Sequence, residues 1–189
     1  MNLKLEGKKV AILATDGFEQ VELTSPKNEL EKNGATVHVV SPKDTDEVIK
    51  GWDKDNWGID MKVDINVKNA KTSDYDALVL PGGVINPDTL RTDENAVKFI
   101  RGFFDEGKPV SAICHAPILL AEAGVVKGRN ITSYKSIKTD LKNAGANWED
   151  SSVVTDAGLV TSRNPDDLPD FNRKMVEEIR EGKHEEQTV

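Results

Sequence analysis

The chain has 189 residues but only one cysteine, three histidines and 5% aromatic residues. A single cysteine, Cys114, cannot form a disulfide within the chain, so we expect a reducing compartment. The histidines are His38, His115 and His184, and no two of them have the spacing of metal ligands. No Walker or dinucleotide-binding glycine pattern occurs either. The sequence therefore predicts neither a metal site nor a nucleotide cofactor.

Long apolar runs and an excess of positive charge are also missing. The run at residues 10–14 follows a polar N-terminus and is too short for a signal-peptide core or a membrane span. The net charge of −8 and the pI of about 5.0 disfavour binding to nucleic acid or to an anionic membrane. We expect a cytoplasmic protein with no nucleic-acid partner and no membrane partner.

The composition that is present is that of a folded domain. Hydrophobic residues make up 37% of the chain and charged residues 31%, with no repeat and no low-complexity segment. The length fits a single domain over residues 1–189. Buried strands are expected at 10–14, 36–41, 76–80 and 110–113, separated by helical patterns at 18–33, 87–106 and 118–125. This alternation predicts an α/β fold with a mainly parallel sheet.

The other segments are less regular. Residues 48–52 and 61–67 suggest a hairpin or edge strands, joined by a surface loop. Trp52 and Trp57 fall in this region, and we interpret them as local anchors without a functional role. The remaining elements are a strand near 130–134, a helix at 137–144, short paired strands at 153–154 and 159–161, and a last helix after 164–169.

The most informative stretch joins a buried strand to a buried helix at Cys114 and His115. Such a sharp turn exposes its junction residue, and Pro117 is typical of a first helical turn. A cysteine at a helix N-terminus should have a lowered thiol pKa, and the thiolate is the reactive form. The alternative is an ordinary buried cysteine that a histidine happens to follow.

Gly82 and Gly83 follow another buried strand. Paired glycines at the carboxyl end of a parallel strand let backbone N–H groups approach a ligand closely. An ordinary turn would give the same pattern.

Six segments together resemble the PfpI-type intracellular protease family: AILATDGFEQVELTSP, DYDALVLPGG, NPDTLR, GKPVSAICHAP, LKNAGA and VTSRNPDDLP. This family belongs to the superfamily of the parkinsonism-associated protein and the class I glutamine amidotransferase domains. The resemblance extends over residues 8–179. It implies a flavodoxin-like three-layer α/β/α sandwich with a cysteine nucleophile at a sharp strand-to-helix turn.

The resemblance also implies roles for individual residues. Cys114 matches the nucleophile, His115 its adjacent histidine, and Gly82 and Gly83 the glycines of the oxyanion site. Asp88 matches the acidic residue that completes the triad from a neighbouring subunit. The residue after the histidine is commonly glycine in the family, and here it is Ala116.

Glu19 matches the carboxyl group that hydrogen-bonds the cysteine. An ionised carboxylate there would raise the thiol pKa, so Glu19 would have to be buried and protonated. We expect Glu22 only to complement the helix dipole.

The leading functional hypothesis is a cytoplasmic stress-response cysteine hydrolase that acts on electrophilic carbonyls, as a glyoxalase or protein deglycase does. Its substrate would be a small aldehyde or a protein, and it would work as a homodimer or higher homo-oligomer. One alternative is an intracellular cysteine peptidase of the PfpI type. Another is a non-catalytic oxidative-stress sensor or holdase chaperone that uses Cys114.

Overall fold

The computed structural model describes residues 4–187 and is built on a seven-stranded sheet in the order β11-β12-β8-β7-β1-β3-β6. All neighbouring strands are parallel except β11 and β12, which are antiparallel. The predicted α/β class with a mainly parallel sheet is confirmed. The strands are β1 (Lys9–Leu13), β3 (Thr36–Ser41), β6 (Ile65–Asn66), β7 (Ala77–Leu80), β8 (Val110–Ile113), β11 (Val154–Asp156) and β12 (Leu159–Ser162).

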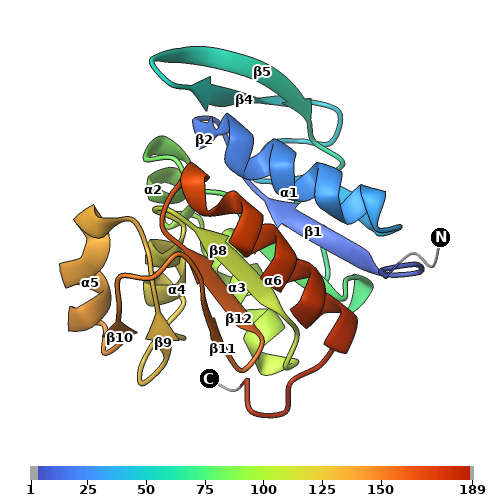
Figure 1. Ribbon diagram of the computed structural model, residues 1–189. Helices are drawn as coiled ribbons and strands as arrows, with labels where there is room; N and C mark the ends of the chain where they lie inside the picture. The colour runs from blue at the N-terminus through green and yellow to red at the C-terminus, as the bar shows by residue number, and fades with distance from the viewer. Residues whose placement is uncertain (1–3, 188–189) are drawn as a thin grey trace.

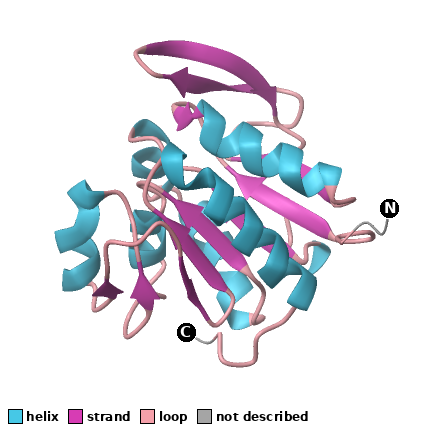
Figure 2. Ribbon diagram, viewed as in Figure 1, coloured by secondary structure: helices cyan, strands magenta, loops and turns pink. Residues whose placement is uncertain are grey.

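Helices cover both faces of this sheet, as a doubly covered parallel sheet requires (Figure 1, Figure 2). One face carries α1 (Gln20–Lys32) and α6 (Leu168–Glu181), whose Leu23 and Phe171 are fully buried. The other face carries α3 (Glu94–Asp105) and α4 (Pro117–Glu122), with α5 (Lys138–Asn143) outside α4. The layers form the three-layer α/β/α sandwich that the resemblance implied.

The segment predicted as a helix at 87–106 is two helices. The first is α2 (Ile85–Leu90), and α3 starts after Asp93. Asp93 caps α3, because its carboxylate accepts hydrogen bonds from the N–H groups of Asn95 and Ala96, each at 2.9 Å.

A small β-structure lies beside α1 at the end of the main sheet (Figure 1). It contains β2 (Phe18–Glu19), β4 (Val48–Asp53) and β5 (Asn56–Lys62). The prediction of a loop between two hairpin strands was wrong here, because most of that segment is β5 itself. Trp52 and Trp57 face each other across the hairpin, with their ring centroids 5.4 Å apart.

The predicted strand near 130–134 lies outside the main sheet. It is the short β9 (Asn130–Ile131), which pairs with β10 (Asn147–Trp148) in a separate two-stranded sheet. Single 3₁₀ turns lie at Thr72–Asp74, Lys135–Ile137 and Pro165–Asp167. None of the helices within residues 4–187 is both long and apolar enough to cross a membrane.

This topology brings three connections to one edge of the sheet. β1, β7 and β8 are parallel neighbours, so the residues that follow their carboxyl ends lie together. These residues are Asp16 and Gly17 after β1, Gly82 and Gly83 after β7, and Cys114 after β8. Ligands of open α/β sheets bind at this edge.

Candidate active site

Cys114 occupies the sharp turn between β8 and α4. Its φ angle is 63°, in the left-handed region that non-glycine residues rarely adopt. Two backbone hydrogen bonds hold the turn: Cys114 N–H donates to the Ser162 carbonyl at 3.0 Å, and Tyr134 N–H donates to the Cys114 carbonyl at 2.8 Å. The surrounding strands thus maintain a strained backbone that directs the side chain toward the strand ends.

His115 is held beside the thiol by three contacts. Its Nδ1 lies 3.1 Å from Cys114 Sγ, and its Nε2 lies 3.0 Å from Ser136 Oγ. Its ring stacks on Tyr134 with a centroid distance of 4.7 Å. Burial lowers the pKa of His115, so the ring is neutral at pH 7. We assign the tautomer in which Nε2–H donates to Ser136 and Nδ1 accepts the thiol proton.

Glu22, and not Glu19, is the carboxyl group against the thiol. Its side chain is fully buried, hydrogen-bonds Cys114, and accepts the Gly82 N–H at Oε2 over 2.9 Å. Burial, with a further contribution from the charge of Glu19, raises its pKa to about 8. The expectation that Glu22 only complements the helix dipole was wrong, because its position on α1 faces the sheet.

Glu19 lies further from the reaction centre. Its residue pairs with Trp52 in the small β-structure, and its partly buried side chain lines the cavity in front of Cys114. Partial burial and the charge of Asp53 raise its pKa. Among residues 4–187, the Glu19 side chain makes no hydrogen bond to Cys114, so the contact expected of it is made by Glu22 instead.

The thiol does not have the lowered pKa that the sequence predicted. Cys114 is only 7% exposed, and its burial raises its pKa well above the ordinary value; an ionised Glu22 would raise it further. The backbone N–H groups of Gly83 and His115 both donate to Sγ and act in the opposite direction, but they are the weaker influence. The resting form is therefore a neutral thiol that donates to His115 Nδ1.

Close packing leaves no room for a side chain at Gly82 or at Gly83, but their N–H groups have different hydrogen-bond acceptors. A Cβ on Gly82 would lie 2.7 Å from the Cys114 Cβ, and its N–H is already bonded to Glu22. Gly83 has a φ of +82°, and a Cβ there would lie 2.8 Å from the Glu19 nitrogen. Of the two glycines, Gly83 is the one whose N–H donates to the sulfur, so it is the better candidate donor for an oxyanion.

A cavity of about 450 Å³ opens in front of Cys114. Its wall comes from the turns after the strands, from the β4–β5 hairpin and from the segment before α6. The lining residues are Gly17, Glu19, Glu22, Trp52, Lys54, Gly83, Val84, Ile85, Cys114, His115, Tyr134, Asn164 and Pro165. Trp52, to which the sequence assigned no role, therefore contributes to the binding surface.

Asp88 and Ala116 do not line this cavity. Asp88 is exposed on α2, and the His115 nitrogen that an acid would bind is occupied by Ser136 of the same chain. Ala116 is fully buried in the core on the α3–α4 side of the sheet, whereas Cys114 belongs to the core on the α1–α6 side. The extra methyl group therefore does not crowd the mouth of the cavity.

Three residues of the site were missed from the sequence: Glu22, Tyr134 and Ser136. Helical spacing could have revealed Glu22, because it lies four residues before Pro26 and eight before Leu30, and all three are buried. Tyr134 and Ser136 lie about twenty residues after His115 and reach it only through the fold. No local pattern marks them.

Comparison with known proteins shows which family the chain resembles. The model of the DJ-1/PfpI family matches residues 8–178. "Protein/nucleic acid deglycase 2" of Escherichia coli K12 is 46% identical over 89% of this chain and 96% of its own length. "Putative cysteine protease YraA" of Bacillus subtilis 168 is 43% identical over 89% of this chain and 96% of its own length.

A solved structure shows the same fold. A two-domain protein of Anabaena variabilis, with DJ-1/ThiJ/PfpI-like and ferritin-like domains, has a TM-score of 0.85 and 35% identity; the match covers 90% of this chain and 47% of that one. The family model matches nearly the whole length, and a relative is 46% identical over 89% of the chain, so this chain belongs to the DJ-1/PfpI family.

Proposed function

We propose that this protein is a cysteine-dependent hydrolase that acts on electrophilic carbonyls, in the manner of a glyoxalase or deglycase. One observation carries the proposal: Cys114 Sγ lies 3.1 Å from His115 Nδ1 at the base of an open cavity of about 450 Å³. The nucleophile, its base and the group that orients the base follow the pattern of nucleophilic catalysis. The Escherichia coli relative carries the name deglycase, which supports this reading.

The first step uses His115 as a general base. As Sγ attacks the carbonyl carbon, the thiol proton passes to Nδ1 and a C–S bond forms. Ser136 holds the other ring nitrogen at 3.0 Å, so the resulting imidazolium keeps its orientation. Because the resting thiol is neutral, the enzyme needs this base and does not depend on a preformed thiolate.

The second element is stabilisation of charge. The N–H groups of Gly83 and His115 converge on Sγ and are placed to donate to the oxyanion that forms beside it. Glu22 is largely protonated at pH 7, so it carries little negative charge that would repel a thiolate. The buried, protonated carboxyl group that the resemblance led us to expect at Glu19 is therefore at Glu22.

For a 2-oxoaldehyde such as methylglyoxal, the chemistry needs no external reagent except water. Addition of the thiol gives a hemithioacetal once the proton returns from His115 to the oxyanion. Loss of the proton from the former aldehyde carbon, with protonation of the neighbouring carbonyl oxygen, gives an enediol. Protonation of the second carbon and loss of the hydroxyl proton on the first carbon then give a thioester of a 2-hydroxy acid. Water then hydrolyses the thioester, which releases a 2-hydroxy acid and restores the thiol.

Peptide hydrolysis is the second candidate, and the name of the Bacillus relative supports it. It demands more, because an acid must protonate a poor leaving group. Asp88 is exposed and does not line the cavity of its own chain. It can act as this acid only in a homodimer or higher homo-oligomer that brings it to the cavity of a second copy. We propose such an oligomer, since Val84 (65% exposed) and Ile85 (45% exposed) leave an apolar rim beside α2.

The test compares three substrates: methylglyoxal, a glycated peptide and a fluorogenic peptide. We expect turnover of the first two by the parent chain and loss of that turnover in Cys114→Ser and His115→Gln. Asp88→Asn should leave aldehyde turnover unchanged. Cleavage of the fluorogenic peptide that depends on Asp88, without aldehyde turnover, would favour the peptidase instead.

A further inference from the structure

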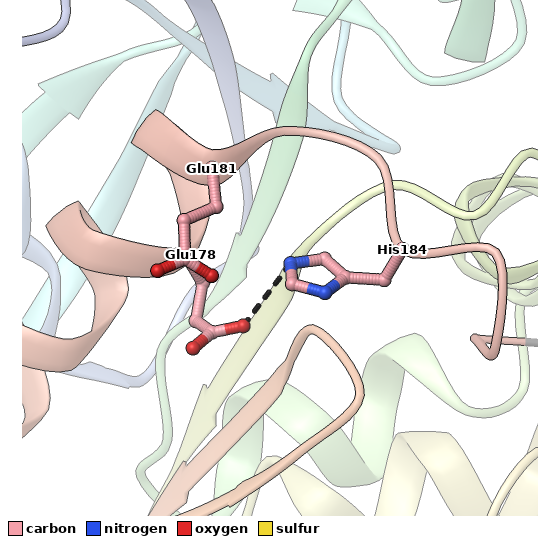
Figure 3. A group of neighbouring side chains, drawn as sticks. All are labelled: Glu178, Glu181 and His184. Carbon is pink, nitrogen blue, oxygen red and sulfur yellow. Dashed lines mark ion pairs between the residues drawn. The ribbon is translucent and has the colours of Figure 1, made fainter.

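We propose that the end of α6 and the segment after it form a binding site for a divalent transition-metal ion of the zinc class. Its ligands are Glu178, Glu181 and His184 (Figure 3). One potential ligand atom from each of the three residues lies within 4.8 Å of the others. An imidazole nitrogen together with carboxylate oxygens is a donor set that Zn²⁺ accepts, with water completing the coordination.

The spacing of the donor atoms fits a small ion. His184 Nε2 and Glu178 Oε2 are 3.1 Å apart. Two ligand atoms on a tetrahedral zinc ion, each about 2.0–2.2 Å from it, are roughly 3.3–3.6 Å apart. The separation of this pair is close to that range, and Glu181, whose side chain is exposed, has to move closer.

The backbone arranges these groups before any ion binds. Glu178 and Glu181 are three residues apart on the last turn of α6, so their side chains share one face. Gly182, with a φ of 88°, ends the helix, and His184 N–H then donates to the Gly107 carbonyl at 2.8 Å. The chain thus folds back and presents the imidazole to the two carboxylates (Figure 3).

Buried polar atoms without hydrogen-bond partners lie at the end of α6, so an ion pair between His184 and Glu178 does not account for all the polar groups there. His184 Nε2 is buried and forms no hydrogen bond within residues 4–187, although Glu178 Oε2 lies 3.1 Å from it. Gln187 is 1% exposed, and neither atom of its amide has a partner in the described chain. Buried polar groups are normally satisfied.

Gln187 belongs to the same cluster. Its Oε1 and the His184 ring carbon Cδ2, which is bonded to Nε2, both pack against Gly158. The cluster places two acidic side chains beside one imidazole, and Glu178 among them is only 6% exposed. A bound cation with a coordinated water would compensate the charge and give the Gln187 amide a partner.

The site is separate from the candidate active site. Gly107 and Gly158 precede β8 and β12, whereas Cys114 follows β8. The cluster therefore lies at the amino ends of these parallel strands and the thiol at their carboxyl ends. The bound ion would stabilise the packing of the C-terminal segment against the turns that precede these strands, and it would take no part in catalysis. The sequence predicted no metal site because no two histidines have ligand spacing, whereas this cluster combines one histidine with two carboxylates.

The experiment measures metal binding directly. The protein is prepared without a histidine tag in a Cys114→Ser background, which removes the one thiol, and is stripped with chelator. Calorimetric titration with Zn²⁺, Ca²⁺ and Mg²⁺ follows, on this parent and on His184→Gln and Glu181→Gln. Glu185→Gln, which changes an exposed acid on the same segment, is the matched control. Thermal melting with and without Zn²⁺ provides a second readout.

We expect one equivalent of Zn²⁺ per chain, no saturable binding of Ca²⁺ or Mg²⁺, and a higher melting temperature with zinc. Affinity should fall by at least about tenfold in His184→Gln and Glu181→Gln and stay unchanged in Glu185→Gln. The proposal is overturned if the parent shows no saturable Zn²⁺ binding, or if His184→Gln binds as tightly as the parent. It is also overturned if His184→Gln lowers the melting temperature equally with and without zinc, which is the behaviour of an ion pair only.

Discussion

Replacing Glu22 with glutamine should make the protein more stable at neutral pH. The side chain is fully buried, and Oε2 accepts the Gly82 N–H, which a glutamine oxygen can also accept. The substitution therefore preserves the shape and the hydrogen bond while it removes the ionisable group. What it removes is the free-energy cost of keeping a proton that the unfolded chain would release.

The size and sign of the effect follow from the raised pKa. Below pH 4.5, Glu22 is protonated in both the folded and the unfolded chain, so its titration takes nothing from the free energy of unfolding. Between pH 4.5 and about 8, the unfolded chain releases the proton and the folded chain keeps it, so the stability falls as the pH rises. At pH 7 this loss is roughly 3 kcal/mol, since each pKa unit corresponds to about 1.4 kcal/mol.

The assay is urea denaturation of the parent and Glu22→Gln between pH 4.5 and 8. Other groups titrate in the same range, so the quantity to follow is the difference between the two proteins. It should grow with pH in favour of Glu22→Gln, by roughly 3 kcal/mol at pH 7. Glu29→Gln changes a half-exposed carboxyl on the same helix and is the control. A difference that stays constant with pH would show that Glu22 is not held protonated.

Three further substitutions test other parts of the account. Ser136→Ala should lower kcat/KM for methylglyoxal by about tenfold without changing the melting temperature, because His115 loses its orienting partner; an unchanged rate would remove Ser136 from the mechanism. Gly82→Ala should destabilise the fold by about 1–3 kcal/mol in urea, since its methyl would lie 2.7 Å from Cys114 Cβ; wild-type stability would contradict the packing. Asp93→Ala should cost about 1 kcal/mol in the same assay, and a negligible change would mean that the cap does not matter.

Much of the architecture could be predicted from periodicity. Continuous apolar runs marked β1 and β7, and a run interrupted by Ser111 alone marked β8, because strands covered on both faces have almost no polar side. The hairpin was only half predicted, since β5 is exposed along nearly all of its length and carries no apolar run. Its strand structure comes from pairing with β4, which a local pattern does not show.

At the site, the sequence identified the sulfur and its neighbouring histidine but misjudged their environment. The predicted direction of the Cys114 pKa shift was wrong. The order of strand and helix shows that a helix dipole lies near the thiol, but it does not show how deeply the thiol is buried. The carboxyl group beside the sulfur was expected to be Glu19, and the structure places Glu22, three residues later, in that position. The side chain that faces inward depends on how α1 packs on the sheet.

The central claim is that Cys114, deprotonated by His115, attacks the substrate carbonyl. The most direct test is the rate of methylglyoxal consumption by the parent and by Cys114→Ser at equal melting temperature. We predict that kcat/KM falls by at least about 10³-fold in Cys114→Ser. If Cys114→Ser retains kcat/KM within tenfold of the parent, the sulfur is not the nucleophile and the proposed mechanism is wrong.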